Sequence, residues 1–293
     1  MIIWIASYPK SGNTWVKSLL SSYLYSDNGI FNSHLSKKIQ QFPDKNYFKY
    51  FMQDFSDTKK ISDYWIAAQD RINLFNENKT IFFKTHSALC TYKNNSFTNK
   101  NNTQAVIYVV RDPRNVITSI SNYYSLSVDE SYNFMTDKNK IISEAEKGGK
   151  NFGIATVLGS WALHYKSWEK IKFAPILIVK YEDLIKNTKN SLIIIINFLK
   201  KFMDIKIDDK KILNTVNSCS FDNLAKMEKA GDFIEERFSN KSMKKIIFFN
   251  LGKKNNWEKL LNPKMSEKIG IVFNKEMKEL EYLEREKGIE PST

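Results

Sequence analysis

The sequence predicts an α/β protein built on a parallel β-sheet, and two patterns support this fold class. Short apolar segments rich in β-branched residues recur along the chain, and segments with helical spacing of apolar residues lie between them. The apolar segments lack polar alternation, as is typical of strands covered on both faces. An alternation of strands and helices is typical of a parallel sheet. The expected strands are Ile2–Ala6, Thr80–Lys84, Ala105–Arg111 and Ile176–Tyr181.

Three helices are expected from the spacing of apolar residues. The segment 14–25 repeats large apolar residues every four positions, and the segment 152–172 carries Leu158, Trp161, Tyr165 and Trp168 along one stripe. Residues 263–283 form a charged amphipathic pattern, which predicts a further helix. Residues 284–293 are expected to be a frayed tail.

The chain is expected to fold as a single domain over residues 1–283. It has 293 residues, of which 42% are hydrophobic, so it can bury a sizeable core. No internal repeat and no Pro/Gly/Ser-rich linker divides it. The segments 27–79 and 125–150 follow neither period clearly. Insertions of this kind at strand ends commonly shape or cover a substrate pocket, so both are expected on the acceptor side.

Composition favours a cytoplasmic protein that binds an anion. The longest apolar run, Leu192–Leu199, is too short to span a bilayer, and the amino terminus lacks the pattern of a secretory signal. Two cysteines, Cys90 and Cys219, are too few for a disulfide framework. The net charge of +13 favours an anionic ligand without specifying which, and much of the excess is scattered surface lysine.

The first motif, Tyr8-Pro9-Lys10-Ser11-Gly12-Asn13-Thr14-Trp15, follows the first expected strand and begins a helix. A helix amino terminus presents unpaired N–H groups and positive potential, so it can hold a phosphate or sulfate, and Lys10 adds a full charge. A nucleoside triphosphatase loop requires lysine directly after its second glycine, where Asn13 stands, and an earlier glycine that is missing. The motif therefore predicts an anion site of a different kind.

The second motif, Arg111-Asp112-Pro113-Arg114-Asn115-Val116, follows the third expected strand and leads into a helix that runs to Tyr124. Ser119 lies two helical turns into this segment. A guanidinium at the end of the strand and this hydroxyl could therefore converge on one phosphate.

The third motif, Lys84-Thr85-His86, lies at the carboxyl end of the second expected strand, where parallel sheets bind their ligands. A histidine can accept a proton near neutral pH, so His86 is the candidate general base. The other two histidines, His34 and His164, lie in a polar loop and in an amphipathic helix.

Taken in this order, the motifs resemble those of the PAPS-dependent sulfotransferase family, whose loop reads Tyr-Pro-Lys-Ser-Gly-Thr-Thr-Trp and differs here only at Asn13. The resemblance covers residues 2 to about 280. It implies a P-loop-like parallel sheet of about five strands, flanked by helices. It also implies transfer of a sulfuryl group from 3′-phosphoadenosine-5′-phosphosulfate (PAPS) to a hydroxyl or amine of a small, carbohydrate or lipid acceptor. No metal ion, nucleic acid or stable membrane insertion is expected.

The resemblance also implies a role for each motif. His86 would be the general base, Lys84 would contact the transferring sulfuryl group, and Lys10 would stabilise the leaving oxygen. In related carbohydrate-directed enzymes a glutamate often serves as the base. Arg111 and Ser119 would bind the 3′-phosphate. The loop residues assigned to the donor nucleotide are Lys10, Ser11, Gly12, Asn13, Thr14 and Trp15.

Two later aromatic residues match family positions near the nucleotide. Tyr181 begins a Tyr-Glu-Asp sequence after the last expected strand and is implied as an adenosine contact. Phe221 matches an aromatic residue that stacks on adenine opposite Trp15, although packing in the core is an alternative use of its ring.

The segment 249–257 matches the family pattern Arg-Lys-Gly-x-x-Gly-Asp-Trp only in part. Gly252 and Lys253 are implied as nucleotide contacts, but Asn250 and Leu251 replace the usual basic pair. Either the lysines that follow Gly252 replace the lost charge, or the 3′-phosphate is held more loosely.

Two other functions remain open from the residues alone. A P-loop nucleotide-binding kinase-like enzyme would require Mg²⁺ and an acidic metal ligand after a strand. A non-catalytic basic protein that binds phosphate or nucleic acid would show salt-sensitive binding to polynucleotides and little effect of His86→Ala. The sequence leaves the acceptor and the oligomeric state open.

Overall fold

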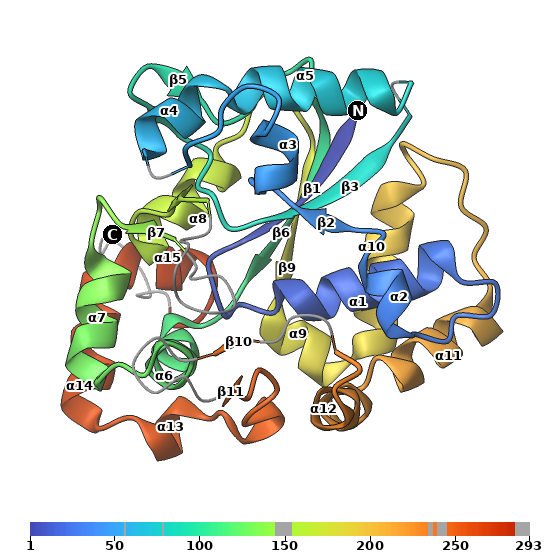
Figure 1. The fold of residues 1–293 in the computed structure, drawn as a ribbon. Coiled ribbons are helices and arrows are strands. Elements are labelled where there is room, and N and C mark those ends of the chain that lie inside the picture. The colour runs from blue at the N-terminus through green and yellow to red at the C-terminus, as the bar shows by residue number, and fades with distance from the viewer. Residues whose placement is uncertain (56, 78, 144–153, 234–236, 239–244, 285–293) are drawn as a thin grey trace, which may run out of the picture.

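The computed structural model describes residues 1–55, 57–77, 79–143, 154–233, 237–238 and 245–284. Its centre is a five-stranded sheet in the order β2-β3-β1-β6-β9, in which every neighbouring pair is parallel. Helices flank this sheet (Figure 1), which confirms the predicted fold class. The strands are β1 (Ile2–Ser7), β2 (Gln40–Gln41), β3 (Ile81–Thr85), β6 (Thr103–Val110) and β9 (Ile176–Lys180).

The four expected strands form within about two residues of their predicted bounds, a shift that is ordinary for strand ends. The five strands agree with the number that the family resemblance implies, but the position of the fifth strand, β2, was not predicted. It consists of two glutamines that pair with Phe83 and Lys84 of β3 at the edge of the sheet. Two polar residues are too few to show a periodic pattern. The hydrogen bonds of the pairing are made by the main chain, so they leave no mark on the choice of side chains.

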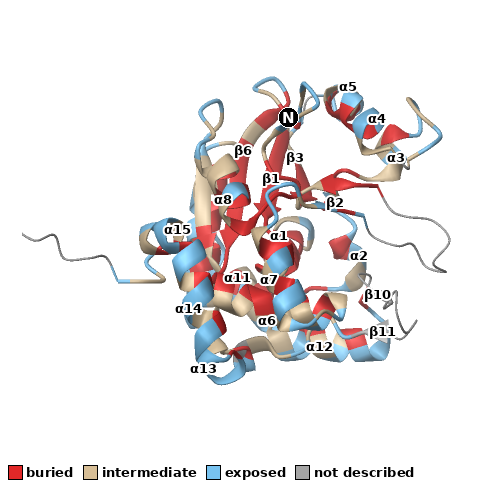
Figure 2. Ribbon diagram, turned by 90° about the vertical axis from the view of Figure 1, so that its left-hand side faces the viewer, coloured by how far each residue is buried: buried red, intermediate tan, exposed pale blue. Residues whose placement is uncertain are grey.

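Both faces of the sheet are buried, which explains the continuous apolar runs. In β1, Trp4 and Ala6 belong to one hydrophobic cluster, whereas Ile3 and Ile5 belong to the other. Figure 2 shows the buried strands between their covering helices. The helices that contribute to the Trp4 side are α3 (Lys45–Phe48), α4 (Thr58–Asp63), α5 (Trp65–Phe75), α6 (Pro113–Tyr124), α7 (Val128–Thr136), α8 (Trp161–Glu169), α14 (Pro263–Val272) and α15 (Asn274–Glu279).

The opposite face packs against helices from the middle of the chain and from its beginning. These helices are α1 (Asn13–Tyr25), α2 (Ser33–Ser36), α9 (Tyr181–Lys186), α10 (Thr188–Leu199), α11 (Asp209–Ser218) and α12 (Phe221–Ala230). The remaining elements are the 3₁₀ helix η1 (Gly252–Lys254), α13 (Trp257–Leu260), and the pairs β4 (Thr91–Tyr92) with β5 (Asn95–Ser96), β7 (Ile141–Ile142) with β8 (Thr156–Val157), and β10 (Arg237–Phe238) with β11 (Lys245–Ile246).

Two helix predictions were too long. The helix expected over 152–172 begins only at Trp161, because Ser160 caps it by accepting from the Leu163 N–H, and residues 156–157 are a strand. The helix expected over 263–283 is two helices that break at Phe273. The Phe273 ring is buried 5.1 Å from the Trp161 ring, so the change of direction serves packing.

The two segments without a clear period contain short helices. Residues 27–79 hold α2 to α5 and β2, and the described part of 125–150 holds α7 and β7. Residues 144–150 of the second segment lie outside the described residues, as does the tail from residue 285. Within the described ranges, no helix combines the length and the apolar character needed to cross a membrane.

Candidate active site

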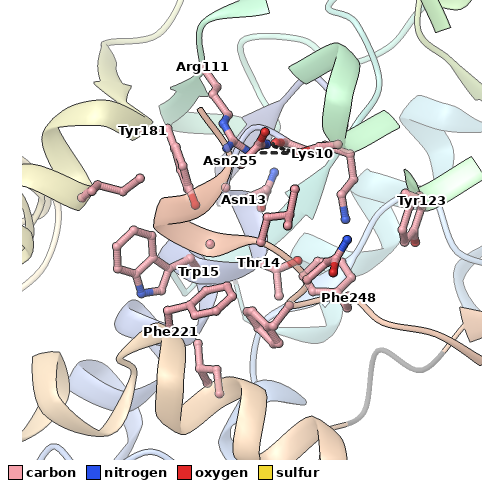
Figure 3. A pocket seen from close by; sticks show the side chains of 18 of the residues that line it. Lys10, Asn13, Thr14, Trp15, Arg111, Tyr123, Tyr181, Phe221, Phe248 and Asn255 are labelled. Atoms are coloured by element: carbon pink, nitrogen blue, oxygen red, sulfur yellow. Dashed lines mark hydrogen bonds between the residues drawn. The ribbon is translucent and has the colours of Figure 1, made fainter. Parts of the chain in front are cut away.

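One pocket of about 650 Å³ lies at the carboxyl ends of the central strands. Its walls come from the β1–α1 loop, the end of β3, helix α6, the start of α9, helix α12 and the segment 248–255 (Figure 3). In a parallel sheet this end, where strand order reverses around β1, is the usual ligand site. The structure brings the three predicted motifs together here.

The β1–α1 loop is held in an unusual backbone conformation. Gly12 has φ 102°, and a Cβ there would stand 2.5 Å from Cδ2 of Tyr181, so only glycine fits. Lys10 also has a positive φ, 66°, which is uncommon for a residue with a side chain. Helix α1 begins directly afterwards at Asn13, and its first residues line the pocket. The N–H groups of Trp15 and Val16 donate to the carbonyl oxygen of Gly12 (3.0 and 3.1 Å), and the positive potential at this end of the helix suits an anion.

The Asn13 side chain serves the scaffold. Its Nδ2 donates to the carbonyl oxygens of Ile5 (2.9 Å) and Thr85 (3.2 Å) and to Oγ of Ser7 (3.1 Å), which joins the ends of β1 and β3 to the loop. The Nδ2 group of Asn13 is thus directed into the protein. Its Oδ1 is buried without a partner among the described residues, and Asn13 lines the pocket at the start of α1.

The Lys10 side chain lies between two aromatic rings. Its Nζ is 3.9 Å from the centre of the Tyr123 ring and 4.0 Å from that of Phe248. Cation–π contacts of this kind hold an ammonium group in place without removing its charge. Sequence reasoning missed both rings. The end of α6 with its paired tyrosines offered a signal for Tyr123, whereas Phe248 lies in a segment with no recognisable spacing.

Arg111 and Ser119 meet as expected. Nη1 of Arg111 donates to Oγ of Ser119 (3.3 Å) and to the carbonyl oxygen of Lys10 (3.1 Å), and its guanidinium lies 4.1 Å from the centre of the Tyr181 ring. Asn255, which sequence reasoning did not assign, also reaches this point, where its Nδ2 donates to Oγ of Ser119 at 2.8 Å.

Some buried polar atoms in and near the pocket have no hydrogen-bond partner among the described residues. Two are donors: Arg111 Nε, in the pocket wall, and Ser11 Oγ, in the β1–α1 loop; Asn13 Oδ1, an acceptor in the wall, is unpartnered as well. A buried donor without a partner costs free energy, and an anionic ligand would supply the missing acceptors. The predicted loop therefore fits a phosphate- or sulfate-bearing ligand.

Aromatic residues form the far wall of the pocket. Trp15 meets the Tyr181 ring edge-on at 5.8 Å, and its Nε1 donates to the carbonyl oxygen of Cys219 at 2.8 Å. Phe221 packs against Gly252, where a Cβ would approach its ring to 2.7 Å. All four of these predicted residues line the pocket.

The segment that departs from the family pattern also lines the pocket. Asn250, Leu251 and the exposed Lys254 belong to its wall. Lys253 lies in η1, and its side chain is outside the described part of the structure. Of the two lysines, Lys254 is thus the one whose side chain reaches the pocket in the described structure.

His86 and Lys84 line the same pocket from the end of β3. Nζ of the buried Lys84 donates to Oγ1 of Thr14 at 3.2 Å. His86 Nδ1 is 2.8 Å from the carbonyl oxygen of Ser7, which can only accept, so this nitrogen carries the hydrogen. In the neutral ring the proton-accepting nitrogen is then Nε2, as general base catalysis requires.

Known proteins resemble the chain over almost its whole length. The family model described as sulfotransferase domain matches residues 2–281. An amine sulfotransferase of Oryctolagus cuniculus is 23% identical over 280 residues, covering 94% of this chain and 81% of the relative. A luciferin sulfotransferase of Photinus pyralis is 25% identical, covering 92% and 69%.

Solved structures share the fold. A mouse sulfotransferase in complex with PAP matches with a TM-score of 0.60 and 21% identity, covering 94% of this chain and 84% of that chain. Retinol dehydratase in complex with retinol and PAP matches with a TM-score of 0.57 and 16% identity, covering 94% and 81%.

No three His, Cys, Asp or Glu side chains of the described residues gather as a possible metal site. The family match over residues 2–281 shows that the chain is a sulfotransferase enzyme and belongs to the sulfotransferase-domain family.

Proposed function

We propose that this sulfotransferase uses PAPS as its donor and sulfates the hydroxyl or amine of a small acceptor. The observation that carries the proposal is Arg111 Nε, a buried donor without a partner among the described residues, in the wall of a pocket built from the β1–α1 loop and α6, together with the buried, unpartnered hydroxyl of Ser11 in that loop. The mouse and retinol dehydratase structures hold PAP, the nucleotide that PAPS leaves after transfer, which supports the choice of donor.

Different walls of the pocket would bind different parts of the donor. The first turn of α1 and Lys10 would hold the 5′-phosphosulfate. Arg111 and Ser119 would hold the 3′-phosphate, with Asn255 orienting the serine hydroxyl. The remaining proposed nucleotide contacts are Ser11, Gly12, Asn13, Thr14, Trp15, Tyr181, Phe221, Gly252 and Lys253.

The proposed reaction is a single in-line displacement. His86 Nε2 would accept the acceptor's proton while the acceptor oxygen or nitrogen bonds to sulfur and the bond from sulfur to the bridging oxygen breaks. Lys10 would offset the charge that develops on that bridging oxygen, and Lys84 would face the sulfuryl oxygens. Lys10, Lys84 and Arg111 are among the cationic residues that line the pocket, and we propose that they provide this compensation without a metal ion.

The acceptor and the setting of the enzyme are also proposals. The amine and luciferin sulfotransferases are named for small-molecule acceptors, which favours a small acceptor over a polymer here. We infer that residues 1–283 form one domain whose segments 27–79 and 125–150 shape the acceptor side. The free thiols of Cys90 and Cys219 fit the reducing cytoplasm.

Calorimetric titration tests the donor. Purified protein would be titrated with PAP in the presence of a chelator, and separately with ATP and Mg²⁺, and both titrations would be repeated on Arg111→Ala. We expect metal-independent binding of PAP that the substitution abolishes. Preference for ATP with Mg²⁺ would instead support a kinase-like enzyme, and binding of neither would reject the donor site.

Transfer itself is tested with labelled PAPS and a panel of phenols, amines and hydroxysteroids. His86→Ala should retain PAP affinity and lose turnover, because the substitution removes the base and leaves the nucleotide walls intact. Unchanged turnover in His86→Ala would move the role of base to another group.

A further inference from the structure

A second histidine touches the candidate base through its backbone. His164 lies on α8 and is completely buried. Its Nε2 is 3.0 Å from the carbonyl oxygen of His86, and its Nδ1 is 2.8 Å from the hydroxyl oxygen of Tyr108. The carbonyl can only accept, so His164 Nε2 carries the hydrogen and Nδ1 accepts from the tyrosine hydroxyl. One neutral tautomer therefore satisfies both contacts.

The surroundings of His164 keep the ring neutral. Burial lowers its pKa to about 4. Two tyrosines of the described residues face it: Tyr108, and Tyr8, whose ring meets the imidazole edge-on at 5.6 Å. Burial also raises the pKa of both phenols well above 10, so both partners are uncharged at neutral pH. A neutral imidazole with fixed hydrogen positions can donate in one direction only.

Helix α8 holds the segment that follows β3 at several points. Beyond the contact from His164, Trp168 Nε1 donates to the carbonyl oxygen of Ser87 at 2.9 Å, and Ser167 Oγ accepts from the N–H of Leu89 at 3.0 Å. Residues 164, 167 and 168 share one helix face. Of these contacts, only the one from His164 acts on His86 itself.

His86 is thus held at two places that together fix its ring. The ring donates from Nδ1 to the carbonyl oxygen of Ser7, while its own carbonyl oxygen accepts from His164. The first contact selects the tautomer with a basic Nε2. The second holds the carbonyl group of His86, which is bonded to the Cα from which the ring projects.

We propose that His164, oriented by Tyr108, is a positioning residue that holds His86 in the tautomer and orientation required of a base. The proposal rests on the proposed role of His86. It assigns a function to a buried polar pair that the transfer reaction does not otherwise use.

Kinetics on three variants test the positioning role. In His164→Leu, kcat should fall by about tenfold to a hundredfold, because loss of the anchor misplaces the base. The acceptor KM and the PAP affinity should stay unchanged, because His164 lines no part of the nucleotide pocket. His164→Gln should recover most of kcat, because its carboxamide N–H can reach the same carbonyl. Ser167→Ala is the matched control on the same helix face and should behave as the unmodified enzyme.

Nitrogen-15 NMR of the imidazole rings tests the same contact without donor, acceptor or turnover. The chain has three histidines, so substitution of each assigns every ring. In the unmodified protein we expect the hydrogen of His164 on Nε2 and the hydrogen of His86 on Nδ1. In His164→Gln we expect the hydrogen of His86 to remain on Nδ1. In His164→Leu the His86 ring should populate both tautomers.

The outcomes separate this inference from the proposed transfer. Hydrogen on Nδ1 of His164 in the unmodified protein would overturn the inference even if His164→Leu failed to fold. So would a His164→Gln enzyme as slow as His164→Leu, or an equal loss in Ser167→Ala. Absence of sulfuryl transfer together with the expected tautomers would reject the proposed function and leave the positioning contact established.

Discussion

The Nη1 atom of Arg111 donates to the carbonyl oxygen of Lys10 at 3.1 Å. This bond links the end of β6 to a loop residue with positive φ, and the same nitrogen also donates to Ser119. The guanidinium therefore holds the backbone conformation of the loop as well as the proposed phosphate site. A change at Arg111 should affect both.

Arg111→Lys tests whether geometry or charge matters here. Lysine keeps the charge but cannot bond Lys10 and Ser119 while stacking on Tyr181, so PAP affinity should fall by about tenfold to a hundredfold. Arg114→Lys is the control, because Arg114 pairs with Asp112 and lies outside the pocket wall. Calorimetry compares the two, and equal affinities would show that positive charge alone suffices.

Gly12→Ala should impair nucleotide binding and lower stability by at least about 1 kcal/mol, because the backbone conformation and the Tyr181 ring both exclude a Cβ. Adding Tyr181→Ala should relieve the clash and leave the backbone strain. Gly270→Ala in α14 is the matched control, since no atom lies within 4 Å of the added carbon, and it should be neutral or stabilising. Urea unfolding measures all three, and equal effects of the two glycine changes would refute the steric argument.

Asn13→Asp should destabilise the fold more than Asn13→Ala. The alanine variant loses the donor that joins β1 to β3, whereas aspartate would point an acceptor at the carbonyl oxygens of Ile5 and Thr85. A buried donor or acceptor left unpaired costs about 1–3 kcal/mol, and an unpaired buried charge costs more. Denaturant titrations check the order, and an aspartate variant as stable as the asparagine would contradict the assigned bonds.

His164 should make the fold less stable in acid. Its pKa is about 4 in the folded protein against 6.5 ordinarily, so between these values the unfolded chain binds a proton that the folded chain does not. The stability that the neutral His164 contributes is fully present above pH 6.5. It is lost as pH falls toward 4, by about 1.4 kcal/mol per pH unit and by about 3 kcal/mol in total. His164→Gln should lose less stability than the unmodified protein from about pH 7 to about pH 4.5. Parallel curves for the two proteins would mean that His164 is not the titrating group.

Glu228→Gln should speed the release of nucleotide. The buried carboxylate of Glu228 on α12 accepts from the N–H groups of Phe248 (2.5 Å) and Phe249 (2.9 Å), and so holds the loop that covers Lys10. An amide turns one acceptor into a donor, so PAP dissociation should accelerate by about tenfold. Stopped-flow displacement measures the rate of PAP dissociation, and Glu258→Gln, a change at an exposed residue, is the control. Identical rates in the two variants would show that the loop does not help to retain the nucleotide.

The sequence revealed the parts of the fold that depend on local patterns. Strands β1, β3, β6 and β9 are buried on both faces, so their apolar runs are continuous and easily recognised. Strand β2 escaped prediction because two glutamines at a sheet edge have no pattern. The break at Phe273 escaped because the residue fits a helical stripe, and only its contact with Trp161, distant in sequence, shows why the helix stops.

The residues of the site likewise fall into those that local sequence motifs predict and those that only the structure shows. Lys10, Lys84 and Arg111 lie at strand ends within compact motifs, and their convergence follows from sheet geometry. The rings around Lys10 and the bond from Asn255 to Ser119 come from segments more than one hundred residues away. No spacing rule connects such residues, so these contacts required the structure.

The indole of Trp15 forms part of the pocket wall, which gives the protein a built-in optical probe. Trp257 lies beneath the Arg114 guanidinium, outside that wall, and the other four tryptophans are buried in the core: Trp4, Trp65, Trp161 and Trp168. A ligand that enters the pocket therefore changes the surroundings of one indole and leaves the emission of the core indoles as an internal reference. Occupancy can be followed by fluorescence on the unlabelled chain, before any acceptor is identified.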